Sequence, residues 1–261
     1  MTSPEATRYE VRGPAARITL ASPATRNALS APLVAQLAAH LDSAMDDPAV
    51  RCVVLTGDGP AFCAGADLKS RGDMGKPGSH GGNPFVAILR RMREGPKPVI
   101  CAVNGHAFGG GIGLVAAGDV AIAAENAKFS FSEVRLGLIP AMISVVVLPK
   151  LGEHQTMRLF LTGERFGAAR ALEYGLLHRV VPGEELEAAV QEEIDAISRG
   201  GPIAVGEAKR LVRTVSRLPE DEAFAYAEAR IAELFASEEA AEGMAAFVGK
   251  RPARWVPGEE G

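Results

Sequence analysis

Hydrophobic residues recur along this chain with two periods, one typical of strands and one typical of helices. Residues 9–20 alternate apolar and polar side chains, which predicts a short β-hairpin. Residues 33–45 carry a leucine or methionine at every fourth position, which predicts an amphipathic helix. Residues 52–56 form a nearly continuous apolar run that ends in the turn-forming segment 57–60, as expected for a buried strand.

The alternation of strands and helices continues through the middle of the chain. A helical segment at 86–92 precedes an apolar strand at 98–103. A second helical segment at 111–117 then precedes short strands at 120–123 and 129–131. This succession indicates an α/β fold with largely parallel strands.

The character of the sequence changes near residue 184, beyond which it becomes mostly helical. We therefore expect an α/β core over residues 1–198, followed by a helical region over residues 199–261. The predicted helices span 184–198, 203–216, 219–235 and 238–248.

The composition is that of an ordinary globular protein. Hydrophobic residues make up 47% and charged residues 23% of the 261 positions, enough for one large core or a main core with a small appendage. The net charge of −4 gives no general attraction to nucleic acid or to anionic membranes, so a polyanionic ligand would need a local basic patch. No apolar stretch reaches the ~18 residues that a membrane span requires. The N-terminal segment also lacks the signal-peptide pattern, so we expect a cytoplasmic protein.

The side chains that commonly hold metals or form disulfides are scattered. The cysteines, Cys52, Cys63 and Cys101, form no Cys-x-x-Cys pair, so we expect reduced, buried thiols rather than disulfides or a zinc site. The histidines show no metal-ligand spacing, and we expect no metal. We expect His106 to be a hydrogen-bonded structural residue. The sequence contains no G-x-S-x-G, Walker or H-E-x-x-H motif.

The first stretch with candidate chemistry, residues 61–69, directly follows the strand predicted at 52–56. Its small residues allow the backbone to approach a ligand closely, and Gly65 can adopt a positive φ. If a helix begins at Asp67, the N–H of Ala66 could donate to an anion. Taken alone, the pattern is more often that of a structural turn between a strand and a helix.

The second stretch, residues 104–113, contains three consecutive glycines that would open a helix. Backbone N–H groups at the positive end of such a helix are suited to hold negative charge. The pattern G-x-G-x-x-A, which begins at Gly111, also matches a dinucleotide fingerprint, with Glu133 about twenty residues further on. The predicted helix is too short for the crossover of a βαβ unit, which disfavours a nicotinamide site.

The third stretch, residues 129–140, places Glu133 between an apolar strand and an apolar segment that contains Gly137 and Pro140. A carboxylate there is either a surface or capping group, or a partly desolvated acid/base group with a raised pKa. The local pattern leaves both interpretations open.

In this order and spacing, the three stretches resemble the signature of the enoyl-CoA hydratase/isomerase (crotonase) superfamily, and the similarity extends from about Val11 to Trp255. The resemblance implies a spiral of ββα units followed by a helical C-terminal oligomerisation region. It implies an acyl-CoA substrate, no further cofactor, and a homotrimer or a dimer of trimers. It also implies that the N–H groups of Ala66 and Gly110 form an oxyanion hole for the thioester oxygen, with Glu133 as the acid/base group.

The resemblance further implies which residues contact CoA. Arg26 lies in the segment that the family uses against the CoA nucleotide, whereas Phe247 and Lys250 would face the CoA of a neighbouring subunit. Asp119 matches a position that the family uses structurally. The expected substrate-binding positions are Arg26, Ala28, Ala64, Asp67, Leu68, Lys69, Gly109, Gly113, Pro140, Phe247 and Lys250.

The sequence departs from the family pattern at two places. Gly113 stands where two-glutamate hydratases carry their first catalytic glutamate, and the glycine pair usual after Pro140 is replaced in residues 141–144. This combination resembles a bacterial branch often labelled methylglutaconyl-CoA hydratase-like. We expect a hydratase-type lyase. The alternatives are a Δ3-Δ2 enoyl-CoA isomerase that uses a single glutamate and a noncatalytic acyl-CoA-binding subunit.

Overall fold

The computed structural model describes residues 5–68 and 82–256, and its larger sheet begins with the expected hairpin. Strands β1 (Thr7–Arg12) and β2 (Ala15–Leu20) pair antiparallel, and every later pairing in this sheet is parallel. The strand order is β1-β2-β3-β5-β7-β10. The remaining strands are β3 (Cys52–Gly57), β5 (Val99–Val103), β7 (Val120–Ala124) and β10 (Arg179–Val181).

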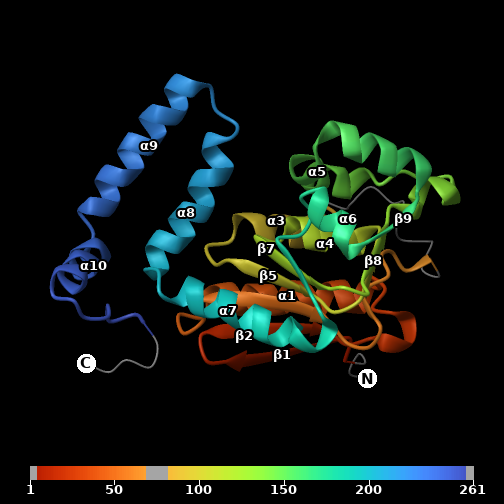
Figure 1. The fold of residues 1–261 in the computed structure, drawn as a ribbon, viewed down its shortest axis with the longest axis horizontal. Coiled ribbons are helices and arrows are strands. Elements are labelled where there is room, and N and C mark those ends of the chain that lie inside the picture. The colour runs from red at the N-terminus through yellow and green to blue at the C-terminus, as the bar shows by residue number, and fades with distance from the viewer. Residues whose placement is uncertain (1–4, 69–81, 257–261) are drawn as a thin grey trace.

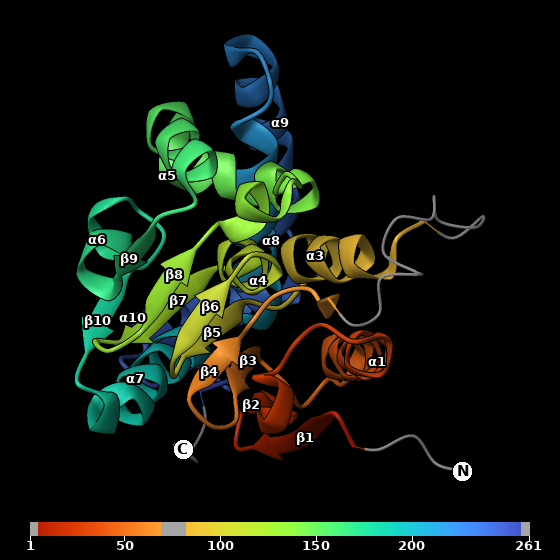
Figure 2. The same ribbon diagram turned by 90° about the vertical axis from the view of Figure 1, so that its right-hand side faces the viewer.

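A smaller sheet of short strands lies beside the larger one, with the order β4-β6-β8-β9 (Figure 2). In each core turn, a strand of the larger sheet is followed along the chain by a strand of the smaller sheet: β3 by β4, β5 by β6, and β7 by β8. This alternation confirms the expected spiral of ββα units. The short strands are β4 (Ala61–Cys63), β6 (His106–Phe108), β8 (Lys128–Ser130) and β9 (Arg165–Gly167).

Helices cover both faces of the larger sheet, which explains why its central strands are continuously apolar. On one face, α1 (Ala31–Asp46) buries its leucines and Met45 at 4% exposure or less. On the other face, α7 (Leu186–Ser198) packs Val190 and Ile194 against the side chains of β3, β5 and β7 that point that way. The core helices predicted at 33–45 and 86–92 are therefore present.

The glycine-rich stretch opens a short helix that contacts one short and one long helix. Helix α3 (Pro84–Glu94) contacts α4 (Gly110–Ala117), and α4 in turn packs against α5 (Ala141–Thr162). Helix α5 is interrupted at Gly152, where φ is +70°. The remaining elements are α6 (Ala168–Glu173) and the 3-10 turns η1 (Pro23–Thr25), η3 (Ser132–Leu136) and η4 (Gly183–Glu185).

Three C-terminal helices project from the core and form what we call the C-terminal arm, residues 202–248 (Figure 1). The arm touches the core where Lys209 and Arg213 share the carboxylate of Asp119, at 2.8 and 2.6 Å. Its apolar side chains, such as Phe224 at 63% and Phe235 at 64% exposure, are uncovered in a single chain. The helices are α8 (Pro202–Val215), α9 (Glu220–Phe235) and α10 (Glu238–Val248). Across the described ranges, none of the helices has the length and apolarity needed to cross a membrane.

Candidate active site

Two backbone segments from the first and second motifs meet at the edge of the smaller sheet. Gly65 has a φ of +86°, and a Cβ added there would lie 2.6 Å from the Phe108 carbonyl oxygen and 3.3 Å from the Gly110 nitrogen. The N–H of Leu29 donates to the Gly65 carbonyl at 2.8 Å and so holds this segment in place. Ala66, the next residue, is therefore held alongside Gly110.

Gly110 begins α4, so its N–H belongs to the first turn, where no intrahelical acceptor exists. The eight-residue helix also directs the positive end of its dipole toward this point. A negatively developing oxygen placed between Ala66 and Gly110 would thus meet backbone dipoles that folding has already oriented.

Glu133 brings its carboxyl group to the same helix terminus. A Cβ on Gly109, the residue that caps α4, would lie 2.9 Å from Glu133 Oε1. The N–H of Gly109 donates to the Ser130 carbonyl at 3.0 Å, which joins the helix terminus to the strand that leads to Glu133. The three groups expected to do chemistry therefore converge on Gly109.

Burial is the main cause of a raised pKa for Glu133, and a hydrogen bond from its own backbone N–H lowers it in part. Its Oε2 atom is buried and has no hydrogen-bond partner among the described residues. An unpaired, partly desolvated carboxyl group holds its proton more tightly than a solvated one. The structure thus favours the acid/base interpretation of Glu133 over that of a surface cap.

The position of the missing first glutamate is filled by apolar side chains. A Cβ on Gly113 would lie 2.4 Å from Ile143 Cγ2 and 3.6 Å from Phe85 Cζ. Ile143 comes from the first turn of α5, within the altered segment after Pro140, and is 4% exposed. The two departures from the family pattern are therefore in contact, because the side chain of Ile143 fills the space beside Gly113.

Asn27 was not predicted as a site residue, yet it holds the expected CoA-binding segment in place. It is fully buried with a φ of +56°, and its Nδ2 donates to the Ala61 carbonyl at 2.8 Å. Its Oδ1 accepts from the Ser22 N–H at 2.8 Å. The Arg26 carbonyl accepts from the Ala64 N–H at 2.9 Å, so the turn that carries Arg26 is fixed to the first motif.

The remaining expected residues divide between the site and the arm. Ala28 and Pro140 are buried near the site, whereas Asp67 is half-buried and Leu68 is exposed beside Ala66. Lys69 lies outside the described residues, as does most of the helix expected from Asp67 onward. Phe247 lies on α10 and is 86% exposed, and Lys250 follows the end of that helix. In Figure 1, α10 lies on the far side of α8 from α4. Within one chain, these two do not join the site.

The expectation that His106 is hydrogen-bonded is wrong for one ring nitrogen, because its buried Nδ1 has no partner among the described residues. The ring instead stacks on Phe108 at 5.9 Å. Burial, and then the charges of Lys128, Arg165 and Arg26, lower its pKa. These effects favour the neutral form of the imidazole.

The cysteines are free and buried, as expected. Burial raises the pKa of the Cys63 thiol to about 12, so this residue beside the site is an unreactive packing group. Over the described ranges, no cluster of three or more histidine, cysteine or acidic residues could hold a metal ion.

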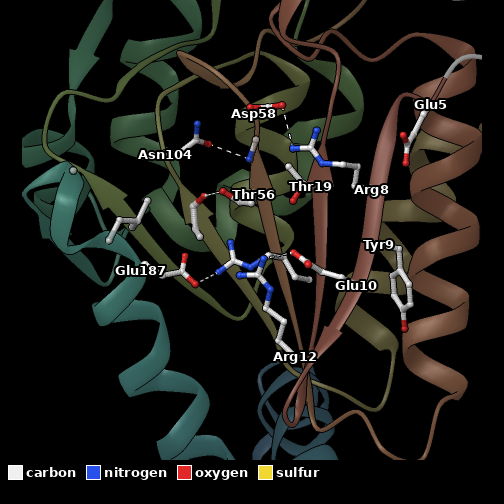
Figure 3. A pocket seen from close by; sticks show the side chains of 15 residues that line it. Glu5, Arg8, Tyr9, Glu10, Arg12, Thr19, Thr56, Asp58, Asn104 and Glu187 are labelled. Carbon is white, nitrogen blue, oxygen red and sulfur yellow. Dashed lines mark hydrogen bonds and ion pairs between the residues drawn. The ribbon is translucent and has the colours of Figure 1, made fainter.

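A cavity of about 620 Å³ lies elsewhere, over β1, β2, β3 and the start of α7 (Figure 3). It contains none of the expected site residues. Its arginines are paired with carboxylates: Arg8 with Asp58, Arg12 with Glu10, and Arg17 with Glu187. This cavity therefore has no excess charge with which to bind an anion.

Comparison with known proteins identifies the family of this chain. Residues 11–257 match the enoyl-CoA hydratase/isomerase family. The chain belongs to this family. It is 39% identical to enoyl-CoA hydratase EchA19 of Mycobacterium tuberculosis over 248 residues, 93% of each chain.

Two further members of the family extend the comparison. Carnitinyl-CoA dehydratase of Salmonella enteritidis is 35% identical over 249 residues, 93% of this chain and 95% of that one. The crystal structure of an enoyl-CoA hydratase from Shewanella pealeana superimposes with a TM-score of 0.90 at 32% identity, covering 96% of both chains. The expected superfamily and fold are thereby confirmed.

Proposed function

We propose that this family member is a hydratase-type lyase that acts on an enoyl-CoA thioester through a stabilised enolate. The observation that carries the proposal is the carboxyl group of Glu133 against Gly109, at the helix terminus where Gly110 meets the segment that contains Gly65. The relatives named as enoyl-CoA hydratase and carnitinyl-CoA dehydratase support the reaction class, since dehydration is the reverse of hydration.

In the proposed mechanism, the thioester oxygen accepts hydrogen bonds from Ala66 and Gly110. Charge builds on that oxygen as a nucleophile adds to the β-carbon, and fixed dipoles stabilise it without reorganisation. Loss of one such donor typically costs about 3–4 kcal/mol of barrier. Because these donors are backbone groups, conservative side-chain changes leave them in place.

Glu133 moves the proton in this mechanism. It takes a proton from water as the hydroxyl group bonds to the β-carbon, and it returns that proton to the α-carbon. Its raised pKa brings it closer to neutral pH, where one group can serve as both base and acid.

The alternative reaction is Δ3-Δ2 isomerisation, and the observation that favours it is the apolar filling around Gly113. Removal of one acid/base group from a two-group mechanism typically costs ~10²–10⁴-fold in rate. An isomerase needs only one carboxylate to carry a proton between two carbons, whereas a hydratase must also orient water. The names of the relatives favour hydration, which we place first.

The proposed assembly is a homotrimer or a dimer of trimers, with residues 1–198 as the core and residues 199–261 as the trimerisation region. The uncovered apolar side chains of the C-terminal arm support this proposal. In the assembly, Phe247 and Lys250 would contact the CoA of a neighbouring subunit, while Arg26 contacts the nucleotide from its own subunit. Tight CoA-thioester binding without turnover would instead support the noncatalytic subunit.

The test is Glu133→Gln, assayed with crotonyl-, 3-enoyl- and methylglutaconyl-CoA by thioester absorbance and mass spectrometry. We expect kcat to fall at least ~10²-fold while thioester affinity stays nearly unchanged. Glu173→Gln, which changes an exposed glutamate on α6, is the matched control. Near wild-type turnover of the Glu133 variant on the substrate that the wild type converts would remove this residue from the mechanism.

Isotopic water separates the two reactions in the wild-type enzyme. Hydration adds solvent oxygen at the β-carbon and a solvent hydrogen at the α-carbon. Isomerisation adds no oxygen. Incorporation of ¹⁸O from labelled water would therefore establish the lyase, and a shifted double bond without ¹⁸O would establish the isomerase.

A further inference from the structure

A second cavity, of about 430 Å³, lies between the end of α3 and one face of α8, where the C-terminal arm leaves the core. We call it the α3–α8 groove. It is separate from the residues that surround Glu133, and it lies in the size range of small-ligand sites. Its lining combines one acidic side chain, Glu94, with five basic ones: Arg93, Lys209, Arg210, Arg213 and Arg217.

Neighbouring carboxylates neutralise only part of this positive charge. Asp119 is shared between Lys209 and Arg213, and its Oδ2 also accepts from the Val99 N–H at 2.9 Å. Arg210 pairs with Glu207 on its own helix at 3.3 Å. The single negative charge of Asp119 therefore balances only one of the two positive charges of Lys209 and Arg213, and the groove contains further arginines.

Arg93 and Arg217 are the cations that remain. Within the described parts of the chain, neither guanidinium group has an ion pair or a hydrogen bond. One comes from α3 and the other follows α8, so they approach the cavity from opposite sides. The pKa of Arg93 is lowered first by burial and then by repulsion from Arg213 and Arg217, which Glu94 and Asp119 only partly offset.

Loss of a proton does not relieve this repulsion, because a guanidinium group stays charged in proteins. A bound anion does relieve it, and the planar fork of arginine matches the oxygens of a phosphate group in two parallel hydrogen bonds. We propose that the α3–α8 groove binds a phosphate or diphosphate group, with Arg93 and Arg217 as ligands and Arg213 oriented by Asp119.

The contrast with the larger cavity supports this choice. Each of the arginines that line the larger cavity already has a carboxylate partner, such as Asp58 for Arg8 (Figure 3). The α3–α8 groove is smaller and carries the excess of positive charge that an anion site needs.

An anion in the groove would join the arm to the core. Helix α3 carries Phe85 at its other end, against the space beside Gly110 and Gly113. Helix α8 begins the arm that ends in Phe247 and Lys250. Bound phosphate would therefore fix the arm relative to the helix that packs on the candidate active site, and we expect it to raise the thermal unfolding temperature.

The experiment is isothermal titration of the full-length protein with sodium pyrophosphate at low ionic strength. We expect saturable binding of one ion per chain, weakened at least about tenfold in the double variant Arg93→Gln/Arg217→Gln, since two charge-assisted contacts are lost. The matched control is Arg90→Gln, which removes the same charge from α3 outside the groove. Circular dichroism establishes that each variant is folded.

Two further ligands identify the source of the phosphate. Titration with inorganic phosphate tests a free ion, and titration of the Arg26→Ala variant with CoA tests the nucleotide of a second CoA molecule.

Pyrophosphate binding that the double variant leaves unchanged, or that Arg26→Ala alone abolishes, would overturn the proposal. Absence of saturable binding, with altered sedimentation of the double variant, would instead make the groove a contact between copies of the chain. Absence of binding with unaltered sedimentation would also overturn it. A catalytic defect in Glu133→Gln bears on the proposed reaction and leaves this site untouched.

Discussion

The contact between Gly113 and Ile143 can be tested by a double-mutant cycle. In Gly113→Ala, the new methyl group would lie 2.4 Å from Ile143 Cγ2 and 3.1 Å from Ile143 Cβ. Both distances are shorter than the ordinary separation of about 3.5–4 Å between non-bonded carbons. Ile143 is a β-branched residue in a helix and has one strongly preferred χ1 rotamer, so it cannot easily turn away.

The expected magnitudes follow from two opposing effects. Overpacking of a filled core typically costs about 1–3 kcal/mol, and a fixed neighbour places this site at the upper end. Replacing a helical glycine by alanine gains about 0.5–1 kcal/mol. Gly113→Ala should thus destabilise the protein by about 2 kcal/mol. Ile143→Ala alone should cost about 2–5 kcal/mol through the cavity that it leaves.

In the double variant, the 2.4 Å contact with the Cγ2 methyl group is gone and the helix gain remains, while the milder 3.1 Å contact with the Cβ of residue 143 persists. We expect the double variant to be about 2 kcal/mol more stable than the sum of the single changes implies, a coupling within the range for residues in contact. The assay is urea unfolding of all four proteins, monitored by circular dichroism under identical conditions. Additivity within ~0.5 kcal/mol would show that Ile143 does not fill the space beside Gly113.

Three further predictions concern charge and assembly. Burial raises the pKa of Glu133, so the contribution of this carboxyl group to folding stability is greatest at low pH. That contribution is lost as pH rises through the folded-state pKa. Glu133→Gln should therefore lose less stability than wild type between acid and neutral pH. Equal pH dependence of the two in urea unfolding would contradict this. Alanine at Arg26 or at Lys250 should raise KM for the thioester and weaken its salt dependence, and an unchanged KM at low and high salt in both variants would refute the assignment. Deletion of residues 238–261 should reduce both the mass measured by light scattering and CoA affinity, and retention of both would refute the proposed role of α10.

Most of the larger sheet and the helices α1 and α7 that cover it were predictable from their own periods, whereas its edge strand β10 and the long helix α5 were not predicted. The leucines of α1 all lie on the buried face, and the apolar runs of β3 and β5 are buried on both faces. Strands β4, β6 and β9 are three residues long, too short to show an alternation that could be distinguished from a loop. Strand β8 is equally short, and it was predicted, one residue late, only because Phe129 and Phe131 alternate with Ser130.

The site residues were predictable from motif order, whereas the contacts that position them were not. Glu133 and Gly110 lie in separate motifs, and only the folded chain shows the carboxyl group against the helix terminus. The side-chain amide of Asn27 donates to three backbone carbonyls, each more than thirty residues further along the chain. Its one local signal is a positive φ, which asparagine tolerates better than most residues, and a sequence does not display that angle.

The close approach of backbone to backbone makes the proposed oxyanion hole a property of the fold. A Cβ on Gly111 would lie 2.3 Å from the Cys63 carbonyl, and a Cβ on Gly65 would lie 2.6 Å from the Phe108 carbonyl. The first turn of α4 is therefore pressed against the strand that leads to Ala66, and neither segment can shift without the other. Donors held this rigidly need no reorganisation when charge develops, which is the condition under which they stabilise a transition state most. In the proposed mechanism, the reaction then depends on the side chains beside this fixed backbone, which are Glu133 at Gly109 and Ile143 at Gly113.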